Sequence, residues 1–253
     1  MRIGGWIPRR PDMRCPLFAF GAIARLDRLG EARTIVLAEG TPITDQGRVP
    51  SCVAASVCDA LEIRAHNTGR PVRQLSRAYL HWTARSRDGS QDDPESGTYT
   101  QSAIAAMRKL GVCSAETYPD TESPTAVPFA AAFVEAATNR LDGFRVVQSL
   151  GEVDSALAKN YPVLLAAVVY SDFEHARATY IPSGRAPLWG GHMMVIVGVR
   201  HVDRRRQYLV RNSWGEGWGE GGRTWVDEVF VASAHELCVV SSDGQTSLWD
   251  DVA

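Results

Sequence analysis

The amino-acid sequence predicts an α+β protein, with helices in the first half of the chain and strands in the second. Apolar residues recur at helical spacing after Cys52, and short apolar runs bounded by turn residues follow Phe144. Pro119, Pro124 and Pro128 mark the crossing between the two regions. A chain of 253 residues can bury a sizeable core, and it fits one compact enzyme of two lobes or two small domains.

Three helices are expected in the first half. The first begins at Cys52, and its apolar positions repeat every three or four residues until a Gly-Arg-Pro stop at residues 69–71. Residues 75–87 suit a second helix and residues 100–110 a third. Gly111 ends the third helix, because glycine readily adopts the left-handed conformation found after a helix C-terminus.

The second half is expected to be mainly β. The sequence Ser-Leu-Gly-Glu at residues 149–152 is a capping box, which predicts a short helix that extends to Asn160. Residues 163–169 form an apolar run with the length of a buried strand. Shorter apolar runs separated by turn residues predict further strands at residues 144–147, 193–199, 207–211, 223–226 and 236–240.

Composition and charge limit the classes of partner and the cellular location that we expect. The chain is 45% hydrophobic and 22% charged, and its formal net charge of -2 gives no electrostatic reason to expect a nucleic-acid or membrane partner. No apolar run is long enough for a signal-peptide core or a membrane span. Five scattered cysteines without metal-type spacing agree with a reducing compartment. We therefore expect a cytoplasmic protein without metal or cofactor, and its oligomeric state stays open.

Three short motifs contain the candidate functional residues. Gln46 stands six residues before Cys52, which begins the first predicted helix. His192 follows two glycines and precedes an apolar strand, and Asn212 begins an Asn-Ser-Trp-Gly sequence after the next strand. Each residue type alone is more often structural, since a cysteine in an apolar helix usually belongs to the core. That structural role is our interpretation of three other cysteines, Cys58, Cys113 and Cys238.

Taken together, the motifs resemble those of papain-like cysteine peptidases, in which Cys, His and Asn follow this chain order with similar separations. The resemblance extends from Gly5 to about Val240. It implies a papain-like two-lobed fold, with a helical lobe at about residues 50–125 and an antiparallel β-barrel-like lobe at about residues 140–245. The active-site cleft would lie between the lobes, and residues 41–253 would form the catalytic domain.

Residues 1–40 are expected to be an N-terminal extension. The Gly-Trp-x-Pro sequence at residues 5–8 resembles the segment that precedes the catalytic domain in bacterial papain-like peptidases. The segment is too short to fold alone and is rich in proline and arginine. We therefore expect residues 1 to about 35 to lie across or beside the cleft in extended form and to restrain access, as a candidate pro-segment.

The resemblance also assigns roles to individual residues. Cys52 would be the nucleophile, His192 its proton partner, and Asn212 the residue that orients the His192 ring. A helix start and a protonated histidine both favour the thiolate, which is the attacking species. Gln46 would donate to the developing oxyanion, and Trp214 would cover the histidine–asparagine bond from water. The substrate-binding residues that the resemblance implies are Ser96, Gly97, Ala166, Gly190, Gly191 and Trp214.

Two positions differ from the usual papain-like pattern. Val53 stands where most members have a tryptophan, and Pro50 replaces a glycine two residues before Cys52. Proline fixes φ at about −65° and has no N–H, so we expect the oxyanion loop to be reshaped.

The expected function is that of a thiol-dependent endopeptidase, which binds peptides or proteins and hydrolyses them through an acyl-enzyme. Ala166, Gly190 and Gly191 would leave a roomy pocket for a bulky apolar residue two positions before the scissile bond. A papain-fold acyltransferase or macrocyclase uses the same thioester chemistry, and an inactive binding module would keep the cleft without turnover. The sequence leaves both alternatives open.

Overall fold

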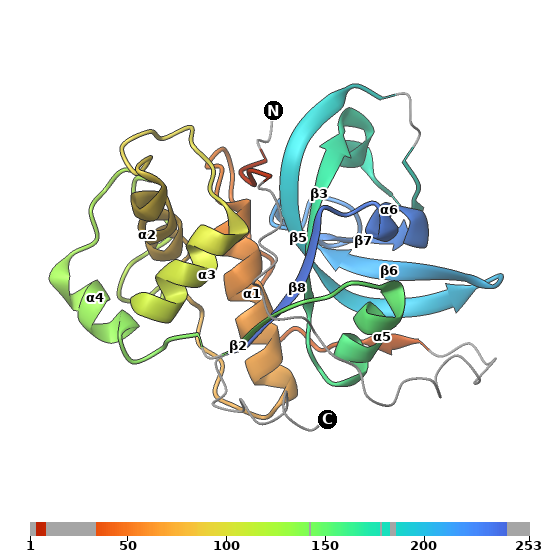
Figure 1. Ribbon diagram of the computed structural model, residues 1–253, viewed down its shortest axis with the longest axis horizontal. Helices are drawn as coiled ribbons and strands as arrows, with labels where there is room; N and C mark the ends of the chain where they lie inside the picture. The colour runs from red at the N-terminus through yellow and green to blue at the C-terminus, as the bar shows by residue number, and fades with distance from the viewer. Residues whose placement is uncertain (1–3, 9–33, 142, 178, 183–185, 242–253) are drawn as a thin grey trace.

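The structure, a computed structural model, describes residues 4–8, 34–141, 143–177, 179–182 and 186–241. Within these residues, helices dominate the first half of the chain and strands the second (Figure 1). The prediction of an α+β fold with a large antiparallel sheet is therefore confirmed. The sheet is not closed, so it differs from the barrel-like lobe that the resemblance implies.

One central helix, α1, lies between the other helices of the first half and the sheet (Figure 1). The described helices are α1 (Cys52–Asn67), α2 (Arg77–Asp88), α3 (Thr100–Lys109), α4 (Ala130–Ala136), α5 (Leu150–Ala158), the 3₁₀ helix η2 (Ser171–His175) and α6 (Glu228–Ala232). Helix α1 packs against α2 and α3 on one side and against the sheet on the other, so its residues from Cys52 to Arg64 are all buried. None of the helices in the described part of the chain is long and apolar enough to cross a membrane.

The strands of the described residues form one sheet. They are β1 (Ile35–Val36), β2 (Gly143–Val146), β3 (Val163–Tyr170), β4 (Thr179–Tyr180), β5 (Leu188–Val202), β6 (Arg205–Arg211), β7 (Arg223–Asp227) and β8 (Glu236–Ser241). Their order is β2-β8-β3-β5-β6-β7-β4, and β1 pairs with β5. Only the β4–β7 pair is parallel among them. Strands β3, β5 and β8 face α1, which places the core between the helices and the sheet.

Capping side chains determine where two helices begin. Ser149 Oγ accepts the backbone N–H of Glu152 at 3.2 Å, and Glu152 Oε2 accepts the backbone N–H of Gln148 at 2.6 Å, which confirms the predicted capping box. Ser76 caps α2 in the same way, by accepting a backbone N–H three residues later. Helix α2 therefore begins at Arg77, two residues after the predicted start.

Strand β5 begins five residues before its predicted start at residue 193. Gly190 and Gly191 have no side chains that could carry an alternating pattern, yet their backbones pair with Val169 and Val168 of β3. His192 therefore lies inside a strand instead of at its beginning. The sequence patterns also do not predict five short elements, because segments this short carry too little of a repeating pattern: α4, η2, α6, β1 and β4.

Candidate active site

A helix, two strands and a loop bring the predicted site residues together. Cys52 is the first residue of α1, and His192 lies in β5, which packs against that helix. Asn212 directly follows β6, the antiparallel neighbour of β5. Gln46 lies in the loop before α1, where its backbone N–H donates to the carbonyl of Ser213 at 2.9 Å. All four predicted residues thus come from segments that adjoin one another between α1 and the sheet.

His192 is held by a hydrogen bond and by ring stacking. Its Nε2 lies 2.7 Å from Oδ1 of Asn212. The buried Trp214 ring stacks on the imidazole, with 4.6 Å between the ring centroids and 27° between the planes. Trp214 therefore covers the histidine–asparagine pair from one side. Burial lowers the pKa of His192 to about 4, and the bond to Asn212 offsets only part of this effect.

The bond to Asn212 also determines which nitrogen of His192 accepts a proton. Oδ1 of Asn212 accepts the backbone N–H of Ser213 at 2.8 Å, which identifies that atom as the amide oxygen. An amide oxygen only accepts, so Nε2 of His192 is the donor and Nδ1 of the neutral ring is the acceptor. Within the described residues, Nδ1 has no hydrogen-bond partner. The thiol of Cys52 and the imidazole are therefore not hydrogen-bonded to each other.

The thiol of Cys52 is fully buried. Its Sγ accepts the backbone N–H of Gly5 at 3.1 Å. Burial raises the pKa of this thiol to about 11, although surrounding backbone N–H groups, that of Gly5 among them, favour the anion. At neutral pH the thiol and the His192 imidazole are therefore both uncharged, and the two groups do not form an ion pair.

Gln46 has its side-chain amide fixed at both atoms. Ser213 Oγ donates to Oε1 at 2.6 Å, and Nε2 donates to the carbonyl of Val49 at 2.8 Å. Ser213 is not among the site residues predicted from the sequence. The available signal is its position between Asn212 and Trp214 in the Asn-Ser-Trp-Gly motif.

Residues 4–8, called the N-terminal segment below, lie over this region. The carbonyl of Gly5 accepts the N–H of Thr98 at 2.8 Å, and the N–H of Ile7 donates to the carbonyl of Thr98 at 3.1 Å. These bonds form a parallel bridge between Trp6 and Thr98. The segment is therefore paired by its backbone with the residue after Gly97, while its Gly5 N–H reaches the thiol.

Two consecutive glycines allow the N-terminal segment to pass this close. A Cβ atom on Gly5 would lie 1.7 Å from the carbonyl oxygen of Pro50, and one on Gly4 would lie 2.2 Å from the carbonyl oxygen of Gly191. Both distances are far below any van der Waals contact, so only glycine fits at either position. Residues 9–33 of the expected extension lie outside the described residues.

Two of the predicted substrate-binding residues adjoin the N-terminal segment. A Cβ atom on Gly97 would lie 1.9 Å from the carbonyl oxygen of Gly5. One on Gly191 would lie 2.5 Å from the carbonyl oxygen of Trp6 and 2.7 Å from Cε3 of its ring. The N-terminal segment therefore occupies the space beside both glycines.

The other predicted substrate-binding residues are placed differently. Ser96 Oγ donates to the carbonyl of Gly97 at 3.0 Å. Gly190 faces open space and has a φ of 153°, which favours glycine. Ala166 is buried in β3, between its partners in β5 and β8. Trp214 lies under the His192 ring, so its role in this structure is to cover the histidine.

The remaining described cysteines are buried, in agreement with the interpretation that they belong to the core: Cys58, Cys113 and Cys238. Burial raises the pKa of Cys113 to about 12, which makes this thiol a poor nucleophile at neutral pH. Cys15 lies outside the described residues. In the ranges that the structure describes, no group of three or more His, Cys, Asp or Glu side chains could hold a metal ion.

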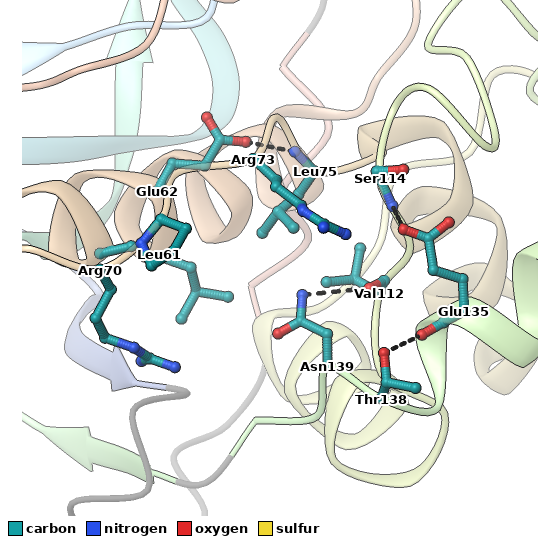
Figure 2. Close-up of a pocket in the computed structure, with 12 residues that line it drawn as sticks. Leu61, Glu62, Arg70, Arg73, Leu75, Val112, Ser114, Glu135, Thr138 and Asn139 are labelled. Carbon is teal, nitrogen blue, oxygen red and sulfur yellow. Dashed lines mark hydrogen bonds between the residues drawn. The ribbon is translucent and has the colours of Figure 1, made fainter.

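A separate pocket of about 160 Å³ lies in the helical half, between α1 and the loops around α4 (Figure 2). Several of its polar side chains are hydrogen-bonded to the protein backbone. Glu62 accepts the backbone N–H of Leu75 at 2.7 Å, Glu135 accepts that of Ser114 at 3.1 Å, and Asn139 Nδ2 donates to the carbonyl of Val112 at 3.3 Å. The pocket lining contains no cysteine or histidine, so this hollow is distinct from the predicted site.

The family model for papain family cysteine proteases matches residues 31–241. These residues include Cys52, His192 and Asn212, and they make up most of the chain. The chain therefore belongs to the papain family of cysteine proteases.

Individual similar proteins come from several kinds of organism. An uncharacterized peptidase C1-like protein of Acanthamoeba polyphaga mimivirus is 25% identical over 250 residues, which cover 86% of this chain and 79% of that protein. Cathepsin B-like cysteine proteinase 2 of Haemonchus contortus is 32% identical over 81 residues, which cover 32% of this chain and 24% of that proteinase. The chain thus spans most of the viral protein and about a quarter of the nematode proteinase.

One solved structure is similar along almost the whole chain. Xylellain, a cysteine protease from Xylella fastidiosa, superposes with a TM-score of 0.85 over 96% of this chain and 98% of that chain. The two sequences are 22% identical, so this likeness shows the shared fold.

Proposed function

We propose that this chain is a thiol-dependent endopeptidase, which hydrolyses peptide bonds through an acyl-enzyme on Cys52. The observation that carries the proposal is the 2.7 Å bond between His192 Nε2 and Asn212 Oδ1. That bond leaves Nδ1 as the proton acceptor on a ring in the strand that packs against the helix of Cys52.

The reaction follows from these groups. Nδ1 of His192 takes the thiol proton, and the Cys52 thiolate attacks the carbonyl carbon of the peptide bond. Negative charge then develops on the carbonyl oxygen, where Nε2 of Gln46 and the backbone N–H of Cys52 donate to it. His192 returns the proton to the leaving amine, and the released amine leaves a thioester on Cys52. Water, deprotonated by His192, hydrolyses the thioester and restores the thiol.

The N-terminal segment keeps this site closed in our proposal. Gly5 donates to the nucleophilic sulfur at 3.1 Å and pairs with Thr98, so a peptide cannot use the same positions until the segment leaves. Closure also keeps water from the thiol, and this burial holds its pKa at about 11. Departure of the segment would hydrate both groups, which favours the thiolate–imidazolium pair.

A substitution in the full chain tests both proposals. Gly5→Val introduces side-chain atoms where even a Cβ would lie 1.7 Å from the Pro50 carbonyl oxygen, so the N-terminal segment is expelled. Gly217→Ala is the matched control, because a Cβ there meets nothing within 4 Å. We expect Gly5→Val to cut an unstructured peptide faster than either the unaltered chain or the control. Cys52→Ala in the Gly5→Val chain should abolish cleavage.

Alkylation separates closure from catalysis. Iodoacetamide at pH 7 should label Cys52 quickly in Gly5→Val and slowly in the unaltered chain, as mapped by mass spectrometry. Equal labelling in both would overturn the closure proposal. If Cys52 is labelled but no peptide is cut, the endopeptidase proposal fails, and intact-mass analysis with added amines then tests acyl transfer from the same thioester.

The proposal also includes a reducing, cytoplasmic compartment. Cys52, Cys58 and Cys113 are free thiols, which suits such a compartment.

A further inference from the structure

The side chain of Trp6 fills a site built from three distant parts of the chain. Only 3% of Trp6 is exposed. Its ring lies against the backbone of Gly191 in β5, where a Cβ atom would come within 2.7 Å of Cε3. Its centroid lies 5.6 Å from that of the ring of His235, the residue directly before β8, with 60° between the planes. We call this the Trp6 site, and it is formed by Gly191, His235, Thr100 and Glu236.

Linked hydrogen bonds line the Trp6 site next to the indole nitrogen. Trp6 Nε1 donates to Thr100 Oγ1 at 3.2 Å, and the Thr100 hydroxyl in turn donates to Oε2 of Glu236. Oε1 of the same carboxylate accepts from Gln101 Nε2 at 3.1 Å. Thr100 thus donates its single hydroxyl hydrogen to the carboxylate. The Thr100 oxygen consequently presents only lone pairs to the Trp6 site, where it can accept a hydrogen bond but cannot donate one.

The position of the Trp6 site relates it to a peptide substrate. Gly5, the neighbour of Trp6, bonds to the thiol, and the backbone around Trp6 pairs with Thr98. A peptide that binds beside Thr98 with its scissile bond at Cys52 therefore places one side chain where the indole of Trp6 lies. Gly191, predicted from the sequence as a wall of a roomy apolar pocket, is the residue that the indole contacts.

Resting on the proposed endopeptidase function, we infer that the Trp6 site recognises an indole side chain of the peptide substrate, and that Thr100 determines this specificity. Thr100 is 1% exposed, so an acceptor at that place is shielded from water. The bond that the Thr100 hydroxyl donates to Glu236 fixes the hydroxyl orientation and polarises the oxygen. An aromatic ring without an N–H gains the same apolar contacts but leaves this acceptor without its donor.

Equilibrium binding to a catalytically inert full chain tests the inference. Gly5→Val, Trp6→Ala and Cys52→Ala together expel the N-terminal segment, remove the competing indole and prevent turnover. Two capped peptides are compared by fluorescence anisotropy, one with tryptophan and one with benzothienylalanine, in which sulfur replaces the indole N–H at nearly the same shape. We expect the tryptophan peptide to bind about 3–10-fold more tightly, which is the effect of one neutral hydrogen bond.

Substitutions at Thr100 provide the control. Thr100→Val removes the acceptor at nearly constant volume and should make the two affinities equal, whereas Thr100→Ser keeps the hydroxyl and should keep the preference. If the valine variant does not fold, the inference is still tested by comparing the affinities of the two peptides for the protein that keeps Thr100. Equal affinities there, or no binding of either peptide, would overturn the inference.

Turnover is measured separately, so that the two proposals can fail independently. The Gly5→Val, Trp6→Ala chain with its cysteine intact is supplied with the same two peptides and with a leucine peptide. Cleavage of all three at equal kcat/KM, together with equal binding, leaves the endopeptidase proposal standing and removes the indole preference. Selective binding of the tryptophan peptide without cleavage of any peptide leaves the indole preference standing and removes the endopeptidase proposal.

Discussion

Arg211 Nε donates to Asp59 Oδ2 at 3.0 Å, and this buried ion pair joins strand β6 to helix α1. Asp59 lies two helical turns after Cys52, and Arg211 directly precedes Asn212. The same carboxylate accepts from Arg77 of α2 at 2.6 Å, while Arg211 also pairs with Glu39. Charges this deeply buried are tolerated because each one is paired. The elements that carry the proposed nucleophile and the orienting asparagine are thus connected through one carboxylate.

Loss of this ion pair should destabilise the fold strongly. Arg211→Met removes one of the two buried arginines that pair with Asp59 and leaves Glu39 with only the partly exposed Arg223, so we expect the free energy of unfolding to fall by about 3 kcal/mol. Arg205→Gln is the matched control, since Arg205 pairs with Asp227 at 3.2 Å but its side chain is 53% exposed. That change should lower stability by no more than ~1 kcal/mol. Urea unfolding of both variants measures the difference, and similar losses would contradict the assignment.

The proposed catalytic residues should have unequal effects on turnover. In the Gly5→Val chain, His192→Ala should remove nearly all kcat, because the thiol loses its proton acceptor and the amine its donor. Asn212→Ala should lower kcat less, because this side chain orients the ring without exchanging a proton itself. Steady-state kinetics with one peptide measure both. A larger loss from Asn212→Ala would mean that the roles are wrongly assigned.

Ser213 should affect turnover only through Gln46. Gln46→Ala in the Gly5→Val chain should lower kcat about 10–1000-fold, the scale of one lost oxyanion donor. Ser213→Ala removes the 2.6 Å bond that holds Oε1 of Gln46, so its effect should be smaller. In a chain that already has Gln46→Ala, the serine substitution should change nothing further. Additive effects in this double-mutant cycle would show that Ser213 acts on its own.

The buried imidazole of His192 makes stability depend on pH. Its pKa is about 4 in the folded protein and 6.5 ordinarily, so between these values the unfolded chain binds a proton that the folded chain does not. Stability must therefore fall as the pH drops from 6.5 to 4, by about 3 kcal/mol from this residue. The pKa of His81 is lowered to about 3 by burial and acts in the same direction.

Comparison with His192→Gln isolates this contribution, since His81 is present in both proteins. Urea unfolding at pH 7 and at pH 4 should show a loss for the unaltered chain that exceeds the loss for the variant by about 3 kcal/mol. Equal losses would place His192 in a more hydrated setting than the structure has.

Much of the fold follows from local sequence patterns. Helix α1 and the capping box at Ser149 were predictable because apolar spacing and a capping side chain act over a few residues. The early start of β5 was not, because Gly190 and Gly191 pair through their backbones alone. The open sheet was not predictable either, because closure depends on which strands meet across the whole sheet.

In the candidate site too, the parts that belong to local motifs could be predicted, and the contacts between distant segments could not. Cys52, His192 and Asn212 belong to recognisable motifs, so their convergence could be expected. The bond from Ser213 to Gln46 spans 167 residues, and that from Trp6 to Thr100 spans 94. Neither leaves a periodic or compositional trace in the sequence, because the partners are brought together by tertiary packing alone.

Because the N-terminal segment is covalently continuous with Cys52, its competition with a peptide is intramolecular. The local concentration of a tethered competitor does not change when the protein is diluted. A peptide then binds only the open fraction of molecules, which raises the apparent KM by the reciprocal of that fraction and leaves kcat unaltered. Specific activity should therefore be the same across a dilution series, whereas blockage of the site by a second molecule would be relieved as the protein becomes more dilute.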